Sequence, residues 1–193
     1  ALGHAGPVAE VVGLRGEAVV VFEGNATPLA IGSKLEQGAE VRTSPAGRVR
    51  LKFIDGSVLV VGDATTLRLD QFRIEEQGSA RRASLSLDIG LISQTVSPAA
   101  GSWTVRTPSA VTAVRGTEYI VEVRKDLITE VNVKSGLVEV SPLPLKKKLK
   151  TRGLSDIAES RPVLLDRENA STRCDAEGEC KAAAILRPAR VRA

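Results

Sequence analysis

Residues 103–123 constrain the fold of this chain more than any other segment, because apolar and polar residues alternate along them. The alternation continues on both sides of the pair Arg115 and Gly116. Successive side chains of a β-strand point to opposite faces, so a period of two predicts a strand with one buried face. We therefore expect two strands separated by a fixed bend at Arg115 and Gly116.

The same pattern recurs between residues 8 and 140. Alternation is clearest in residues 48–53 and 130–134, where apolar residues share one face and charged residues the other. Asp55-Gly56 and Ser135-Gly136 are tight-turn signals, because Gly adopts positive φ without steric cost. Such signals return about every 8 to 12 residues, with no long amphipathic helix between them. The pattern predicts an all-β fold of short strands in a rolled sheet, a β-sandwich or a β-helix-like stack.

Composition narrows the kind of core and the kind of partner. Aromatic residues are only 3% of the chain, so the core must be built from Val, Leu, Ile and Ala. No apolar run reaches 18 residues, so we expect no membrane span in this chain. The net charge is +4, but the cations are spread over predicted strands and stacking aromatics are scarce. A solvated basic surface is therefore favoured over a nucleic-acid partner.

Two zones follow from this pattern. Residues 1–140 form one predicted all-β domain, and residues 141–193 form a Pro/Lys-rich linker and a weakly structured C-terminal tail with a short Cys loop. In the tail, the Ala-rich residues 181–186 predict one or two helical turns. Inside the domain, Val41-Arg-Thr echoes Val105-Arg-Thr, without a strict repeat period.

The only two cysteines, Cys174 and Cys180, lie in one polar loop. An even count in a short loop favours a disulfide, which requires an oxidising compartment. A zinc site is disfavoured, because two ligands are too few and the only histidine, His4, is distant in sequence. Two free thiols in a disordered tail are the remaining alternative. Since the ring is short and lies outside the predicted domain, we expect reduction to change stability little.

Several motifs follow one another in a fixed order along most of the chain. They are Gly13-Leu-Arg-Gly-Glu-Ala-Val, Leu35 to Val41-Arg-Thr, Gly47 to Asp55-Gly-Ser, Thr107-Pro to Arg115-Gly-Thr, and residues 129–140. This order resembles the FecR domain, a bacterial periplasmic module of cell-surface signalling and related envelope proteins. The likeness covers about residues 12–140. It implies a periplasmic location after removal of a signal peptide, and contact with another envelope component.

The motif residues have mainly structural interpretations. Gly56 suits a turn, and Asp55 is placed to cap that turn through its carboxylate. Arg115, Gly116 and Thr117 form the less obvious candidate motif. We expect the Arg115 guanidinium to join a hydrogen-bond network inside the fold. The alternative is that Arg115 binds a carboxylate of a partner.

The sequence contains no catalytic constellation and no pattern for a cofactor or a metal. A Ser-His-Asp triad would depend on His4, and no phosphate-binding loop or zinc motif is present. We therefore expect a non-enzymatic module that binds another envelope protein, in signalling, sensing or envelope assembly. The alternative is a carbohydrate or cell-wall binding module. Sugar rings stack on exposed aromatic side chains, and Trp103 and Tyr119 are the only large candidates.

Overall fold

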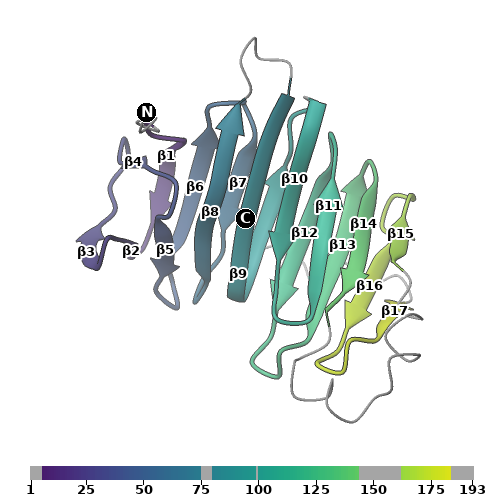
Figure 1. Ribbon diagram of the computed structural model, residues 1–193. Coiled ribbons are helices and arrows are strands. Elements are labelled where there is room, and N and C mark those ends of the chain that lie inside the picture. Colours follow the sequence, from purple (N-terminus) through teal and green to yellow (C-terminus); the bar gives the residue numbers. More distant parts are fainter. Residues whose placement is uncertain (1–5, 75–79, 99, 144–161, 184–193) are drawn as a thin grey trace.

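The computed structural model describes residues 6–74, 80–98, 100–143 and 162–183, and this part of the chain contains strands and turns but no helix. The all-β prediction is thereby confirmed. The 17 described strands belong to one hydrogen-bonded network, which folds into two layers (Figure 1). In the described ranges no helix is long and apolar enough to cross a membrane.

Layer A and layer B are defined by their strand pairings. Layer A runs in the order β4 (Lys34–Leu35), β1 (Ala9–Arg15), β6 (Arg48–Phe53), β7 (Val58–Val61), β9 (Ala80–Thr95), β12 (Glu118–Val123), β13 (Thr129–Ser135), β16 (Ser171–Cys174) and β17 (Cys180–Ala183). Layer B runs in the order β3 (Asn25–Pro28), β2 (Ala18–Phe22), β5 (Glu40–Thr43), β8 (Thr66–Ile74), β9, β10 (Ala100–Arg106), β11 (Ala110–Val114), β14 (Val138–Pro142) and β15 (Val163–Leu165).

Strand β9 belongs to both layers and joins them. Its first part, up to Ile89, pairs with β8 and β10 in layer B, and residues 90–95 pair with β12 in layer A. Strands β1 to β8 lie on one side of β9 and β10 to β17 on the other (Figure 1). The β9–β10 pairing is parallel, whereas the others are antiparallel. Gly90 lies where β9 changes layers and has a φ of +100°.

The core lies between the layers and is formed by the inward faces of alternating strands. In β6 the predicted alternation is regular, with Val49, Leu51 and Phe53 buried and the three residues between and before them exposed. The few aromatics cluster: the Phe53 ring stacks on Phe72 at 5.4 Å and meets Trp103 edge-on at 5.1 Å between centroids. Three of the five aromatic rings therefore form one cluster in a core made largely of aliphatic side chains.

The C-terminal residues extend both layers. Strand β15 pairs with β14 in layer B, while β16 pairs with β13 in layer A and β17 adds to β16. The predicted helical turns are wrong for residues 181–183, which belong to β17. The rest of that Ala-rich stretch, and the Lys-rich run of residues 146–150, lie outside the described residues.

The only tyrosine gives a pH test of this packing. Burial raises the pKa of the Tyr119 phenol far above its usual value, against a smaller opposing effect of its hydrogen bond with Thr112. Above about pH 10 the unfolded chain ionises its tyrosine and the folded chain does not. We therefore expect stability to fall as pH rises beyond that point, with tyrosinate absorbance appearing only together with loss of the β-sheet circular-dichroism signal. Tyrosinate formed near pH 10 in still-folded protein would contradict this burial.

Candidate binding site

The turn between β6 and β7 is fixed by the Asp55 side chain. Its Oδ1 accepts a hydrogen bond from the Ser57 amide at 2.9 Å, and its Oδ2 accepts one from the Ser57 hydroxyl at 2.7 Å. Gly56 has a φ of +85° and donates its amide to the Phe53 carbonyl at 3.0 Å. The carboxylate thus caps its own turn, as the sequence predicts.

Arg81, from β9, anchors this turn from inside the protein. Its Nη1 donates to Asp55 Oδ2 at 2.6 Å, and its Nη2 donates to the Ser97 carbonyl at 2.9 Å. The two side chains of the ion pair are only 2% and 4% exposed. The guanidinium also lies 5.4 Å from the centre of the Trp103 ring, within range of a cation–π contact. Sequence reasoning missed Arg81, because it lies just before the alternating residues 83–89.

The Arg115 bend is organised differently from the sequence expectation. Arg115 is exposed, and its side chain forms no hydrogen bond or ion pair with the described residues. The buried member of the motif is Thr117, whose hydroxyl donates to the Leu137 carbonyl at 2.9 Å and accepts from the Leu137 amide at 3.2 Å. The buried arginine network that was expected at Arg115 is formed instead by Arg81.

This exposure changes the expected effect of substituting Arg115. We expect Arg115→Ala to change the free energy of unfolding by no more than about 0.5 kcal/mol, since an exposed side chain without a partner contributes little. Thr117→Val should cost about 1–3 kcal/mol, because the backbone carbonyl and amide of Leu137 both lose the buried Thr117 hydroxyl as their hydrogen-bond partner. Urea unfolding of the two variants compares them. If Arg115→Ala lost more stability than Thr117→Val, Arg115 would have the structural role expected from the sequence.

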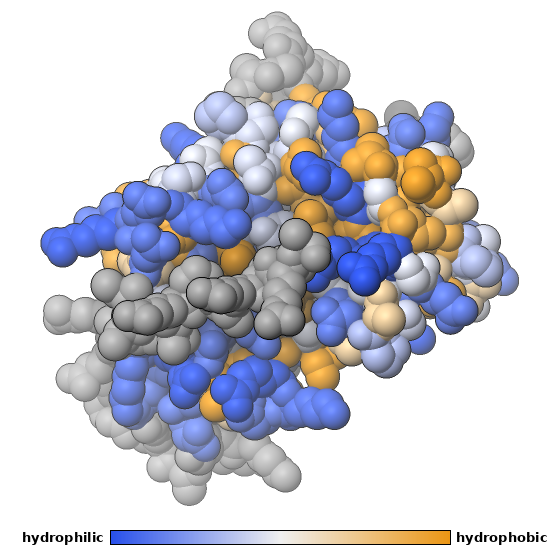
Figure 2. All heavy atoms as spheres, turned by 180° about the vertical axis from the view of Figure 1, so that it is seen from behind, coloured by the Kyte–Doolittle hydropathy of each residue, from blue (hydrophilic) through white to orange (hydrophobic). Residues whose placement is uncertain are grey.

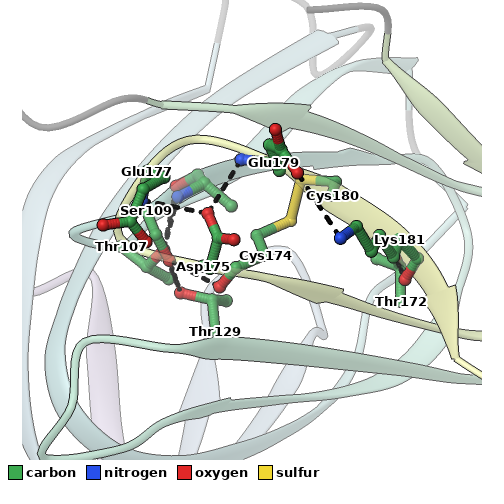
Figure 3. The surroundings of a disulfide bond; sticks show 11 residues. Thr107, Ser109, Thr129, Thr172, Cys174, Asp175, Glu177, Glu179, Cys180 and Lys181 are labelled. Carbon is green, nitrogen blue, oxygen red and sulfur yellow. Dashed lines mark hydrogen bonds and ion pairs between the residues drawn. A yellow bond between two sulfur atoms is a disulfide. The ribbon is translucent and has the colours of Figure 1, made fainter. Parts of the chain in front are cut away.

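A second buried polar cluster supports the C-terminal strands (Figure 3). The Thr129 hydroxyl lies 2.7 Å from both the Thr107 and the Ser109 hydroxyl. Ser109 also donates to the Cys174 carbonyl at 3.2 Å, which connects β16 to the loop before β11. The similar segments Val41-Arg-Thr and Val105-Arg-Thr also make similar contacts. The Thr43 hydroxyl accepts a hydrogen bond from the amide of Thr65, 22 residues later, and the Thr107 hydroxyl bonds to that of Thr129, also 22 residues later.

Cys174 and Cys180 form a disulfide, as the sequence predicts, across the paired strands β16 and β17. Contrary to the expectation from sequence, the ring belongs to the β-stack, and Cys174 is buried in the core. Closing a loop of this length stabilises a chain by about 2 kcal/mol. We therefore expect the variant with both Cys174→Ala and Cys180→Ala to lose about that much in urea unfolding, and thiol titration of the oxidised protein to find no free thiol. Equal stability of oxidised and reduced protein would contradict this.

An open groove lies on the outer face of layer A, at the end of the molecule that carries the N-terminal strands. Its volume is about 580 Å³, and its lining comes mainly from β1, β4, the end of β6 and the β6–β7 turn. Ile54 and Val12 line it and are 59% and 42% exposed, while Phe53 and Gly56 connect it to the capped turn. The Asp55–Arg81 network therefore holds one wall of the groove from behind.

The groove combines an apolar floor with charged margins. Glu10 is paired in register with Lys34 on one side and with Lys52 on the other, and all three line the groove. Figure 2 shows apolar side chains gathered toward this end of the molecule, with strongly hydrophilic ones beside them. Such a surface can bind a partner through aliphatic contacts and ion pairs, and it offers no general acid or nucleophile in a buried setting.

Two other chemistries lack a site in the described part of the chain. No group of three or more His, Cys, Asp or Glu residues is placed there to hold a metal ion. The aromatic residues are Phe22, Phe53, Phe72, Trp103 and Tyr119, and all but the half-buried Phe22 are buried. The structure therefore provides no exposed flat ring for a sugar to stack on.

Comparisons with known proteins agree with this architecture. The family model described as "FecR protein" matches residues 39–139, just over half of the chain. Two crystal structures of a "putative anti-sigma factor" from Parabacteroides distasonis are similar in fold, each with a TM-score of 0.55, at 18% and 19% sequence identity. The similarity covers 75% of this chain and 58% of that protein, so this chain spans less than two thirds of its length. No curated protein matches at the sequence level.

Proposed function

Because this chain belongs to the FecR family, we propose that it is a non-enzymatic module that binds another protein of the bacterial envelope and serves in signalling. The groove on layer A carries this proposal. It exposes aliphatic side chains beside a rigidly capped turn, and contiguous exposed apolar surface is typical of protein interaction sites. The resemblance in fold to a protein described as an anti-sigma factor supports the signalling part.

A periplasmic location is part of the proposal. Disulfides form and persist in oxidising compartments, and here the disulfide joins two strands of the stack. The alternative function, binding of carbohydrate or cell wall, is less well supported, because Trp103 and Tyr119 are both fully buried. Binding of another protein at the groove does not require an exposed Trp103 or Tyr119 ring.

Photocrosslinking in cells tests the proposal. A photoreactive amino acid placed at Ile54 should crosslink to one discrete envelope protein, identified by mass spectrometry. Leu164 on β15 is the matched control, because it is 54% exposed, close to the 59% of Ile54. The same probe at Leu164 should give no such product. Absence of a crosslinked protein at Ile54, or identical products at both positions, would refute the proposed site.

A further inference from the structure

We propose that the partner segment recognised at this groove is acidic: an aliphatic anchor followed by carboxylates at alternate residues of an extended chain. This inference rests on the proposed function and adds the chemistry of the partner. It arises from a row of cations that runs away from the groove along β6.

The cation row consists of Arg48, Arg50 and Lys52, which occupy alternate positions of β6 and are all exposed. Arg15 of β1 is exposed and paired in register with Arg48. None of these four side chains forms an ion pair or a hydrogen bond with any described residue. Glu10 of β1 lies in register beside Lys52, so the four cations face this carboxylate and keep a net positive charge, which favours an anionic partner.

Other surface cations of this protein form ion pairs with nearby carboxylates. Arg42 pairs with Glu40, Arg68 with Asp70, and Lys134 with Glu118. In each of these pairs the carboxylate comes from a nearby position on the same or the adjacent strand. On β6 the alternate positions are all cationic, and the residues of β1 in register with Arg50 and Arg48 are Gly13 and Arg15, so these two arginines have no carboxylate opposite them on β1.

The spacing of the cations on β6 and the aliphatic residues beside them indicate the form of the partner segment. Alternate residues of a strand lie about 7 Å apart, so carboxylates at every second residue of an extended segment match the cation row. The groove lies at the Lys52 end, where Ile54 offers an aliphatic contact. On the far side of the row, half-buried Val58 and Val60 of β7 are paired in register with Lys52 and Arg50. Aliphatic surface thus borders the row at its Lys52 end and along β7.

A defined peptide probes this surface on the complete chain. The probe is a fluorescein-labelled Leu-Leu-Glu-Ser-Glu-Ser-Glu amide, and its comparison peptide carries Gln in place of Glu. Fluorescence anisotropy should show that the Glu peptide binds and that its affinity falls as salt rises, because exposed charges are screened over about 10 Å at 0.1 M salt. The Gln peptide should bind at least about tenfold more weakly.

Two pairs of charge-reversal variants distinguish the effect of this site on peptide affinity from the effect of the protein's net charge. Arg50→Glu with Lys52→Glu should weaken peptide binding at least about tenfold. The control, Arg106→Glu with Arg115→Glu, changes the net charge equally at exposed positions of β10 and the β11–β12 bend, and should change affinity less than about twofold. Ile54→Ser should weaken binding, whereas Leu164→Ser should not.

Three results would overturn the inference. One is no binding of the Glu peptide at about 1 mM, the weak limit of specific recognition. Another is an equal loss in the control charge variant. The third is binding of the chain to phosphatidylglycerol vesicles without binding of the peptide, which would assign the cations to a lipid surface. A crosslinked protein at Ile54 together with any of these results would leave the proposed function intact.

Discussion

Arg81→Ala will lower the free energy of unfolding by about 3–5 kcal/mol, because it leaves a carboxylate buried without its counter-charge. The Asp55 side chain is 4% exposed and would retain only its contacts with Ser57. The Ser97 carbonyl would lose its guanidinium donor, and the Trp103 ring its cation. The measurement is urea unfolding, followed by circular dichroism, of the oxidised wild type and variant.

The exposed pair Arg68–Asp70 provides the matched control. Its side chains are 45% and 28% exposed, so Arg68→Ala should cost at most about 1 kcal/mol. Arg81→Lys should recover only part of the loss, since an ammonium cannot donate in the planar fork that reaches both Asp55 and Ser97. If Arg81→Ala and Arg68→Ala proved equally mild, the buried pair would not hold the turn.

Gly90→Ala will destabilise the fold by more than about 4 kcal/mol, at the severe end for single substitutions. A β-carbon at Gly90 would lie 2.1 Å from the Thr65 hydroxyl oxygen and 2.6 Å from the Thr65 Cα, where no atom fits. The φ of +100° adds a backbone cost of its own. Thr65 cannot simply move away, because its hydroxyl accepts the Leu91 amide at 3.0 Å and its amide donates to Thr43 at 2.9 Å.

Gly32→Ala isolates the backbone contribution. Gly32 has a similar φ of +89°, but a β-carbon there meets no atom within 4 Å. This variant should therefore lose only about 1–2 kcal/mol in thermal or urea unfolding. Equal losses for Gly90→Ala and Gly32→Ala would mean that the close approach of β9 to Thr65 is not required where the strand changes layers.

The groove could be predicted only in part. The sequence identifies the Asp55-Gly56 turn, and the alternation in β6 places Arg48, Arg50 and Lys52 on a solvent-facing side. That these cations lie beside Val12 of β1 depends on the pairing of β1 with β6 across more than thirty residues of chain, for example Ala9 with Phe53. Alternation gives the face of each strand but not its neighbour, because pairing is decided by packing against the other layer.

The sequence alone determined the properties that depend on local chemistry. Residue alternation dictated strands, Asp and Gly dictated the tight turn, and two cysteines six positions apart dictated a small ring. The tertiary structure alone decided that β9 changes layers at Gly90, that Arg81 and not Arg115 is buried, and that the C-terminal strands complete the stack. These features depend on contacts between residues distant along the chain, where close packing and the cost of burying a charge select the partner.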